Sequence, residues 1–331
     1  MTDISVCPCT LAPGYNTYSP VAVRHFLGGK KASHILPYAH FPSGSDIGTF
    51  NENRKRMSLS GAQSKYSVLI DGGRFRLAGE GERGTYILKP AISDFENRGC
   101  SPANEHLTMQ IAYQVYGIET AECGLCFSEE GDIAYLVKRY DIAPDGSRIQ
   151  QEDFASLGGI TAETHGRNYK YDALSYEDLG LLMKKYLPAW PVETVKFFDL
   201  ILFNFLFANG DAHAKNFSAL RTPDGDYRLA PAYDLVNTQI HIPDDSIFAL
   251  RKGLYPIKGD WLNHYVCGTD FLELASRIGI PPAVAKKELE RFRADYSQID
   301  VLIERSFLPE EIRKKYKDIY STRLNSFLRA K

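Results

Sequence analysis

The chain has 331 residues, 44% of them hydrophobic and 12% aromatic, and its 39 basic and 41 acidic side chains give a formal net charge of −2. This composition excludes a disordered protein and allows a substantial buried core. The balanced charge argues against direct nucleic-acid binding, because such domains usually carry a basic excess. The most apolar stretch, Phe197 to Ala208, is too short to cross a bilayer, and the N-terminus shows no secretory signal. We therefore expect a soluble globular protein with no membrane partner.

The segment from about residue 55 to 140 predicts a sheet with one inserted helix. The helix is expected to begin where Ser101 caps it and Pro102 takes its first position, and to stop at Gly117. Runs of β-branched and aromatic residues bounded by turn residues predict strands at Tyr66–Ile70, Phe75–Leu77, Thr85–Lys89, Cys123–Phe127 and Ile133–Val137.

The later part of the chain is mostly helical in pattern. Ser175 and Asp178 predict a capping box ahead of one helix, and Pro191 opens a second helix that is apolar on nearly all sides. Two short strands are expected at Phe217–Leu220 and Tyr227–Leu229. Helical patterns fill much of the chain after residue 282.

These patterns predict an α+β fold in three parts. Residues 1–54 have no clear period and are expected to form an N-terminal extension packed on the next part. Residues 55–140 are expected to form a β-rich lobe with one helix, and residues 141–331 a mainly helical lobe.

The polar segment from Asn209 to Asn216 carries the strongest chemical signal. An Asp at 211, an Asn five positions later and Asp234 beyond a hairpin have the spacing of kinase catalytic loops. This spacing predicts that Asp211 accepts a proton from a hydroxyl, and that Asn216 and Asp234 hold Mg²⁺ on nucleotide phosphates. The alternative is a plain turn whose polar residues cap neighbouring elements. The density of chemical groups after a buried helix favours catalysis.

A lysine and a glutamate in the β-rich part fit the same chemistry. Lys89 ends a strand and Glu105 lies in the inserted helix, as in kinases whose strand Lys grips the phosphates and is held by a helix Glu. The loop Ser58–Lys65 can offer backbone N–H groups to phosphate. The basic run 54–56 beside it would suit a phosphoserine, or is simply solvated.

These motifs resemble the HipA family of bacterial toxin–antitoxin protein kinases. The resemblance spans roughly residues 55–240 and combines Gly-Ala-Gln-x-Lys with Asn-Gly-Asp-x-His-x-Lys-Asn. It implies a two-lobed, protein-kinase-like fold, an ATP-dependent Ser/Thr protein kinase activity, and the cofactors ATP and Mg²⁺. The matching segments, in the family's order, are Ser58–Lys65, Tyr86–Pro90, Asn104-Glu105, Val137–Asp141, Gln151–Phe154, Asn209–Ser218 and Tyr233–Leu235.

The resemblance also implies roles for individual residues. Asp211 would be the proton acceptor, and the family's autophosphorylated serine falls on Ser58, with Ser60 as a second candidate. In this family, phosphorylation of that loop ejects it and abolishes ATP binding. The residues that would line the nucleotide site are Ser60, Gly61, Ala62, Gln63, Ser64, Lys65, Lys89, Lys138, Arg139, Tyr140, His213, Asn216, Tyr233 and Asp234.

The chain is most similar to HipT, the short form, because about fifty-seven residues precede Ser58 and the loop has a Ser-x-Ser spacing. The implied partners are a HipB-like DNA-binding antitoxin, a HipS-like small protein, or both. The implied substrate is an aminoacyl-tRNA synthetase, the glutamyl enzyme for HipA and the tryptophanyl enzyme for HipT. Asp234-Leu235-Val236 departs from the Asp-Phe-Gly of eukaryotic kinases, so an activation segment of their kind is not expected.

Other interpretations stay open at this point. The same fold could phosphorylate a small molecule, or the domain could be a non-catalytic module that bridges an antitoxin and its operator DNA. The pairs Cys7/Cys9 and Cys123/Cys126 could supply four zinc ligands, but they lie more than a hundred residues apart. A reduced bacterial cytoplasm is the simpler expectation, and the sequence leaves open whether the protein is delivered to another cell.

Overall fold

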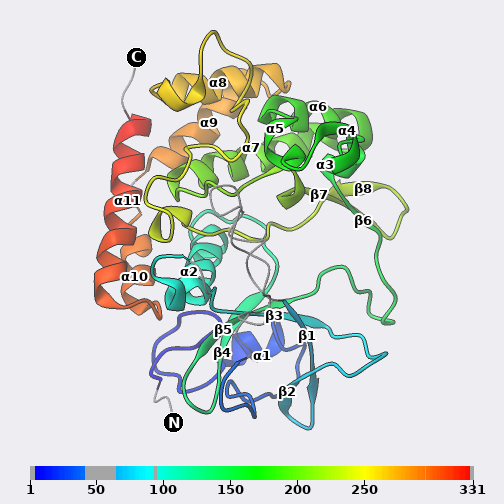
Figure 1. Cartoon of the computed structure of the whole chain (residues 1–331), viewed down its shortest axis with the longest axis vertical. Helices are drawn as coiled ribbons and strands as arrows, with labels where there is room; N and C mark the ends of the chain where they lie inside the picture. The colour runs from blue at the N-terminus through cyan, green and yellow to red at the C-terminus, as the bar shows by residue number, and fades with distance from the viewer. Residues whose placement is uncertain (1–3, 42–64, 93–94, 295, 329–331) are drawn as a thin grey trace.

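The computed structural model of the chain describes residues 4–41, 65–92, 95–294 and 296–328. A curled sheet and the N-terminal segment form one end of the molecule, and helices form the other (Figure 1). Helix α2 (Ser101–Gln114) lies between the sheet and the helical part. The structure therefore has the predicted α+β, kinase-like division into two lobes.

The larger sheet is antiparallel throughout. Its strand order is β2 (Arg74–Leu77), β1 (Tyr66–Asp71), β3 (Tyr86–Pro90), β5 (Ile133–Lys138) and β4 (Cys123–Phe127). The turn between β1 and β2 requires positive φ at two successive residues, which Gly72 (54°) and Gly73 (76°) supply without strain.

The two faces of this sheet pack against different parts of the chain. Leu125, Tyr135 and Val137 face the core that contains α2 and the helical lobe. Val68 and Leu88 belong to a second core, formed with side chains of the N-terminal segment. The alternation of side chains along each strand therefore buries the sheet on both faces.

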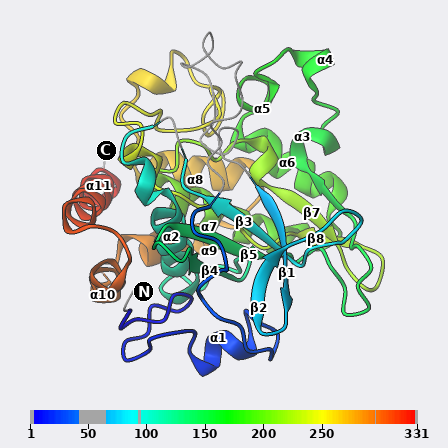
Figure 2. The same cartoon turned by 60° about the horizontal axis from the view of Figure 1, so that its bottom comes forward.

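The N-terminal segment, residues 4–41, has little regular structure apart from α1 (Pro20–Arg24). It crosses the sheet on the face away from α2, as Figure 2 shows. Tyr18 Oη donates to the carbonyl of Leu125 at 2.8 Å, and Tyr86 Oη donates to the carbonyl of Phe26 at 2.8 Å. The boundaries of the three predicted parts, at 54 and 140, stay predictions.

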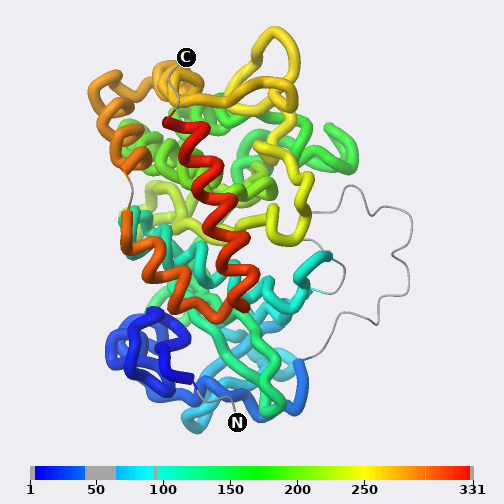
Figure 3. Tube along the Cα trace, turned by 90° about the vertical axis from the view of Figure 1, so that its left-hand side faces the viewer, coloured from blue at the N-terminus to red at the C-terminus, as the bar shows by residue number. Residues whose placement is uncertain are grey.

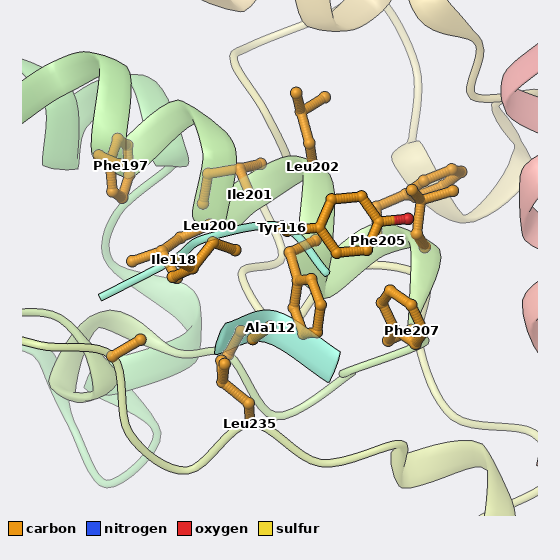
Figure 4. Packing of buried hydrophobic residues seen from close by; sticks show 14 of the residues in the cluster. Ala112, Tyr116, Ile118, Phe197, Leu200, Ile201, Leu202, Phe205, Phe207 and Leu235 are labelled. Atoms are coloured by element: carbon orange, nitrogen blue, oxygen red, sulfur yellow. The ribbon is translucent and has the colours of Figure 1, made fainter. Parts of the chain in front are cut away.

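The helical lobe is built around α7 (Trp190–Leu206), a buried helix whose C-terminal aromatic residues meet the end of α2. The ring centres of Phe203 and Phe207 lie 5.6 and 6.0 Å from that of Tyr116. Figure 4 shows Tyr116 and Phe207 in this packing. The long C-terminal helix α11 (Glu310–Leu328) runs along one side of the molecule (Figure 3). The other helices of this lobe are α3 (Phe154–Leu157), α4 (Ala162–His165), α5 (Tyr169–Asp172), α6 (Tyr176–Tyr186), α8 (Gly268–Arg277), α9 (Pro282–Arg293) and α10 (Ser297–Arg305).

A three-stranded antiparallel sheet lies beside the buried helix. Its order is β6 (Gln151–Asp153), β7 (Ser218–Arg221) and β8 (Tyr227–Leu229). Single 3₁₀ turns occupy Arg98–Cys100 (η4), Ala214–Asn216 (η5), Thr238–Ile240 (η6) and Trp261–Asn263 (η7). No helix in the described part of the chain is long and apolar enough to cross a membrane.

One predicted helix boundary was wrong. Ser101 is the first residue of α2 and not its cap; Cys100 holds the cap position, and the helix ends at Gln114, before Gly117. The Ser101 hydroxyl instead donates to the carbonyl of Arg98 and accepts from the amide of Ile92. The serine therefore fastens the preceding 3₁₀ turn, a role that local sequence does not distinguish from capping.

Candidate active site

Three charged side chains from separate elements form a buried cluster between the lobes. Lys89 Nζ, at the end of β3, lies 2.7 Å from Glu105 Oε1 on α2 and also pairs with the carboxylate of Asp234. Lys89 and Glu105 are buried, and the Asp234 side chain is mostly buried. The Lys89 ammonium also lies 5.4 Å from the centre of the Tyr135 ring. The structure thus joins residues 16 and 145 positions apart.

The charges of this cluster outweigh the effect of burial on the pKa at Lys89 and Asp234, but not at Glu105. Burial alone would raise the pKa of Asp234, but the charge and hydrogen bond of Lys89, together with the Lys65 charge, outweigh it and hold that pKa well below its ordinary value. Burial would lower the pKa of Lys89, but the Asp234 and Glu105 carboxylates raise it. Burial dominates at Glu105 and raises its pKa, with Lys89 opposing. A lysine held in this way can present a fixed positive charge to phosphate.

The backbone that carries Asp234 is strained and held in place from α2. Asp234 has a φ of +55°, a left-handed conformation that is rare outside glycine. Asn104 Nδ2 donates to the carbonyl of Asn237 at 2.9 Å, and Asn104 Oδ1 accepts from the Asn237 amide at 3.2 Å. Neighbouring residues of α2, Asn104 and Glu105, therefore fix both the backbone after Asp234 and, through Lys89, its side chain.

The side chain of Asn209 and the backbone of Gly210 fix the shape of the loop after α7. Asn209 Nδ2 donates to Asn204 Oδ1 on α7 at 2.8 Å and to the carbonyl of Asp234 at 3.3 Å. The Gly210 amide donates to Thr238 Oγ1 at 2.9 Å, and a Cβ at this glycine would overlap the Asp245 carboxylate. Asparagine and glycine at these two positions therefore set the direction in which the next residue, Asp211, leaves the loop.

Asp211 is buried, and a tyrosine hydroxyl already contacts its carboxylate. Tyr171 Oη, on the short helix α5, donates to Asp211 Oδ1 at 2.7 Å. The Tyr171 ring packs edge-on against His213, with 5.1 Å between ring centres, and Lys170 Nζ lies 3.1 Å from His213 Nε2. Burial, aided by the Lys170 charge, lowers the pKa of His213 to about 3, so its imidazole is neutral near pH 7.

Asn216 supplies a candidate metal ligand. The side-chain Oδ1 is buried and has no hydrogen-bond partner among the described residues. The backbone N–H of Asn216 donates to the carbonyl of His213. A buried amide oxygen without a donor, together with the ionised Asp234 carboxylate, is the donor set that Mg²⁺ prefers. The residues present therefore fit a magnesium ion. Lys215 pairs elsewhere, with Asp153 Oδ2 at 2.7 Å.

The predicted hinge residues use their side chains away from this cluster. Lys138 Nζ donates to the carbonyl of His25 in the N-terminal segment and pairs with Glu122. Arg139 pairs with Asp141. Tyr140 is closer to the site, since its ring lies 6.1 Å from that of Tyr233. Roles for Lys138 and Arg139 at the nucleotide would thus use their backbone, and they stay predictions.

The predicted phosphate loop is only partly described. Ser58, Ser60, Gly61, Ala62, Gln63 and Ser64 lie outside the described residues. Lys65, which immediately precedes β1, is described, and its positive charge contributes to the lowered pKa of Asp234. That electrostatic contact places the end of the loop near the cluster.

The cysteines hypothesised to bind zinc are buried as separate thiols. Cys9 Sγ donates to the backbone carbonyl of Cys123 at 3.1 Å, and Cys126 packs in the core beneath the N-terminal segment. In the described part of the chain, no group of three or more His, Cys, Asp or Glu side chains is arranged to hold a metal ion. These cysteines therefore join the N-terminal segment to β4 by packing.

Sequence reasoning missed four contributors to this site. Tyr171 and Lys170 belong to a segment with no helical periodicity, so no signal in the sequence pointed to them. Thr238 and Asn237 follow the Asp234 motif by only a few residues, and that closeness was a usable signal. Lys170, Tyr171 and Thr238 contact the loop around Asp211. Asn237 belongs to the backbone after Asp234, and Asn104 of α2 holds it there.

Residues 57–299 match the model of the HipA-like C-terminal domain. The chain belongs to this family. A putative kinase of Sinorhizobium fredii is 33% identical over 202 residues, which are 60% of this chain and 46% of that protein. A putative kinase of Haemophilus influenzae is 25% identical over 309 residues, 86% of this chain and 85% of that protein. The Serine/threonine-protein kinase toxin HipA of Shewanella oneidensis is 28% identical over 207 residues, 57% and 45% of the two chains.

Solved structures give the same fold. The complex of the Shewanella oneidensis HipA and HipB with operator DNA matches with a TM-score of 0.65 and 22% identity, over 82% of this chain and 65% of that chain. The proinflammatory kinase CtkA of Helicobacter pylori matches with a TM-score of 0.52 and 16% identity, over 78% and 93%. These matches confirm the predicted two-lobed, kinase-like fold. The chain spans about half the length of several of the curated relatives that it matches.

Proposed function

We propose that the protein is an ATP-dependent Ser/Thr protein kinase. The observation that carries this proposal is the buried cluster of Lys89, Glu105 and Asp234. The loop that holds Asp211 is connected to this cluster, because Asn209 of the loop donates a hydrogen bond to the carbonyl of Asp234. A phosphate-gripping lysine, its holding glutamate, a metal-binding aspartate and a catalytic loop are the parts that phosphoryl transfer requires. The kinase names of the relatives support the same activity.

In this proposal the acceptor hydroxyl approaches Asp211, which aligns it and takes its proton as the oxygen bonds to the γ-phosphorus and ADP leaves. Lys89 holds the α- and β-phosphates, and Glu105 keeps its ammonium in position. Asn216 and Asp234 would hold Mg²⁺, which supplies charge neutralisation at the phosphates. The Tyr171 hydroxyl donates to Asp211 Oδ1, and the acceptor can use the second carboxylate oxygen or share the first.

The neutral His213 would shape the pocket beside Asp211 without competing for the proton. Its pKa near 3 keeps it uncharged, so it adds no positive charge against the acceptor or the metal. Tyr140 and Tyr233 would line the nucleotide site, and the amide groups of residues 138–140 would face adenine. The loop Ser60–Lys65 would cover the phosphates.

We also propose a toxin role. Membership of the HipA-like family supports a toxin kinase, and the complex of the Shewanella protein with HipB and DNA supports a HipB-like antitoxin as a partner. The proposed substrate is a serine of an aminoacyl-tRNA synthetase, glutamyl or tryptophanyl, and the proposed autophosphorylation sites are Ser58 and Ser60. The Ser-x-Ser spacing favours a HipT-like form with a HipS-like partner.

Incubation of the protein with Mg-ATP and each purified synthetase, followed by peptide mass spectrometry, tests this proposal. Added phosphate on one synthetase and on Ser58 or Ser60 is the expected result. Phosphate on a small-molecule acceptor alone would show a kinase of a different class. ATP binding without any transfer would favour a bridging module over an enzyme.

A further inference from the structure

Arg323 of α11 is a buried cation that makes no hydrogen bond or ion pair with the described residues. It is 9% exposed, and no hydrogen bond or ion pair holds its guanidinium, which lies 5.3 Å from the ring centre of Phe205. Burial lowers the pKa of Arg323, with the nearby charge of Asp245 opposing. None of the Arg323 nitrogens is among the fully buried polar atoms without a hydrogen-bond partner, so the guanidinium reaches the groove that Arg323 lines and can accept a ligand there.

Arg323 lines a groove of about 340 Å³ between α11 and the 3₁₀ turn η6. This volume lies at the lower end of the range for small-molecule sites. Lys315 Nζ donates to the carbonyl of Ile240 at 3.2 Å and so fastens the helix to the turn. The residues that line the groove are Gln239, Glu311, Lys314, Lys315, Asp318, Ile319, Thr322 and Arg323.

We propose that this groove binds a small molecule through a carboxylate or phosphate group placed against Arg323. The planar guanidinium fork matches both groups, because each can accept two parallel hydrogen bonds. The lining also carries Glu311 and Asp318 beside Lys314 and Lys315, so its charges nearly balance. A singly or doubly charged ligand therefore suits the groove better than a nucleoside triphosphate does.

The groove is separate from the proposed nucleotide site but adjoins its scaffold. Gln239 lines the groove, and the preceding residue, Thr238, accepts a hydrogen bond from the amide of Gly210 at 2.9 Å. Thr238 also donates to the carboxylate of Asp245. One 3₁₀ turn therefore forms a wall of the groove and a support of the Asp211 loop.

Thermal unfolding with inorganic phosphate or acetate, each against sodium chloride of equal ionic strength, tests the proposal. We expect at least one probe at ten times its Kd to raise the Tm of the wild type by about 2 °C. Arg323→Met keeps the packing on Phe205 and should lose this rise. Lys317→Met is the matched control, because Lys317 is an exposed residue of the same helix that pairs with Asp300.

The probes also separate the two ligand classes. A rise with phosphate alone indicates a phosphate ester, and a rise with acetate alone indicates a carboxylate. Arg323→Lys keeps the charge but loses the fork, so it should show a smaller rise than the wild type. No rise with either probe, or an equal rise in Arg323→Met, would overturn the proposal. The measurement involves no phosphate transfer, so its failure is distinct from failure of the proposed kinase.

Discussion

The two sides of the candidate site satisfy their polar groups differently. On the β-sheet side, Lys89, Glu105 and Asp234 pair with one another. On the helical side, Asn216 Oδ1 and His213 Nδ1 are buried with no hydrogen-bond partner among the described residues. The first side is thus complete within the chain, whereas the second presents groups that a metal ion or a substrate could satisfy.

The two sides should therefore differ in whether a substitution changes the stability of the fold or the activity. A buried charge that is paired within the chain contributes to the fold, and removing one partner leaves the other uncompensated. A buried acceptor that has no partner lowers stability and persists where a ligand uses it. Substitutions on the sheet side should therefore change stability first, and those on the helical side should change activity first.

The largest expected effect is that of Lys89→Met. It leaves the Glu105 and Asp234 carboxylates buried side by side, so the free energy of unfolding should fall by about 3–5 kcal/mol, measured by denaturant titration. Nucleotide binding should also be lost. Lys138→Met on β5 is the control, because its pair with Glu122 is partly exposed and should contribute less than about 1 kcal/mol. Equal losses in the two variants would contradict the comparison.

Two asparagines, one on each side of the site, allow a direct comparison of stability with activity. Oδ1 of Asn216 has no hydrogen-bond partner among the described residues, so Asn216→Ala should change the free energy of unfolding little. The same substitution should lower the rate of phosphate transfer more than about a hundredfold. Asn104→Ala leaves the backbone N–H of Asn237 without its acceptor and takes one donor from the Asn237 carbonyl, and it should cost about 1–3 kcal/mol in stability. Denaturation and transfer assays on both variants check this. The opposite pattern would show that Asn216 is structural.

Stability should fall in mild acid because of buried neutral histidines. Burial lowers the pKa of His106 to about 4, against about 6.5 in the unfolded chain, and its Nε2 lies 2.9 Å from the carbonyl of Cys9. Between these pH values the unfolded state binds a proton that the folded state does not, so stability decreases as pH falls from 6.5 towards 4.

His106→Gln should reduce this slope by about 1.4 kcal/mol per pH unit, as measured by urea denaturation at several pH values. The substitution keeps a donor for the Cys9 carbonyl. His165→Gln on the exposed helix α4 is the control and should leave the slope as it is. An unchanged slope in His106→Gln would mean that another group titrates there.

The smallest expected effect concerns Tyr171. Its hydroxyl donates to Asp211 Oδ1 and so makes this carboxylate a weaker proton acceptor, so Tyr171→Phe should raise the rate of phosphate transfer several-fold, by about the value of one hydrogen bond. Steady-state kinetics check this, with Tyr186→Phe at the exposed end of α6 as the control. A lower rate in Tyr171→Phe would instead make the hydroxyl a positioning group for Asp211.

The sequence predicted the elements that have strong local signals. The five predicted strands of the larger sheet and the Ser175–Asp178 capping box all appear in the structure. It did not predict β6, α5 or α8, because three- and four-residue elements have no measurable period and α8 follows an irregular segment. The packing of residues 4–41 depends on long-range contacts that local patterns do not encode.

The candidate site shows the same limit. Spacing singled out Lys89, Glu105 and Asp234, and the structure brings them together. Spacing could not show that the Lys138 side chain bonds to the N-terminal segment, or that Tyr171 contacts Asp211. Both contacts join residues that are far apart in the sequence, and no local sequence pattern predicts such a contact.

The most direct test of the central claim is the peptide mass of the wild type and of Asp211→Asn after incubation with Mg-ATP. The substitution preserves the shape of the side chain and removes its capacity to accept a proton. We predict phosphate on Ser58 or Ser60 in the wild type and none in the variant, with ATP binding retained in both. Equal phosphorylation of the two proteins would contradict the assignment of Asp211 as the catalytic base.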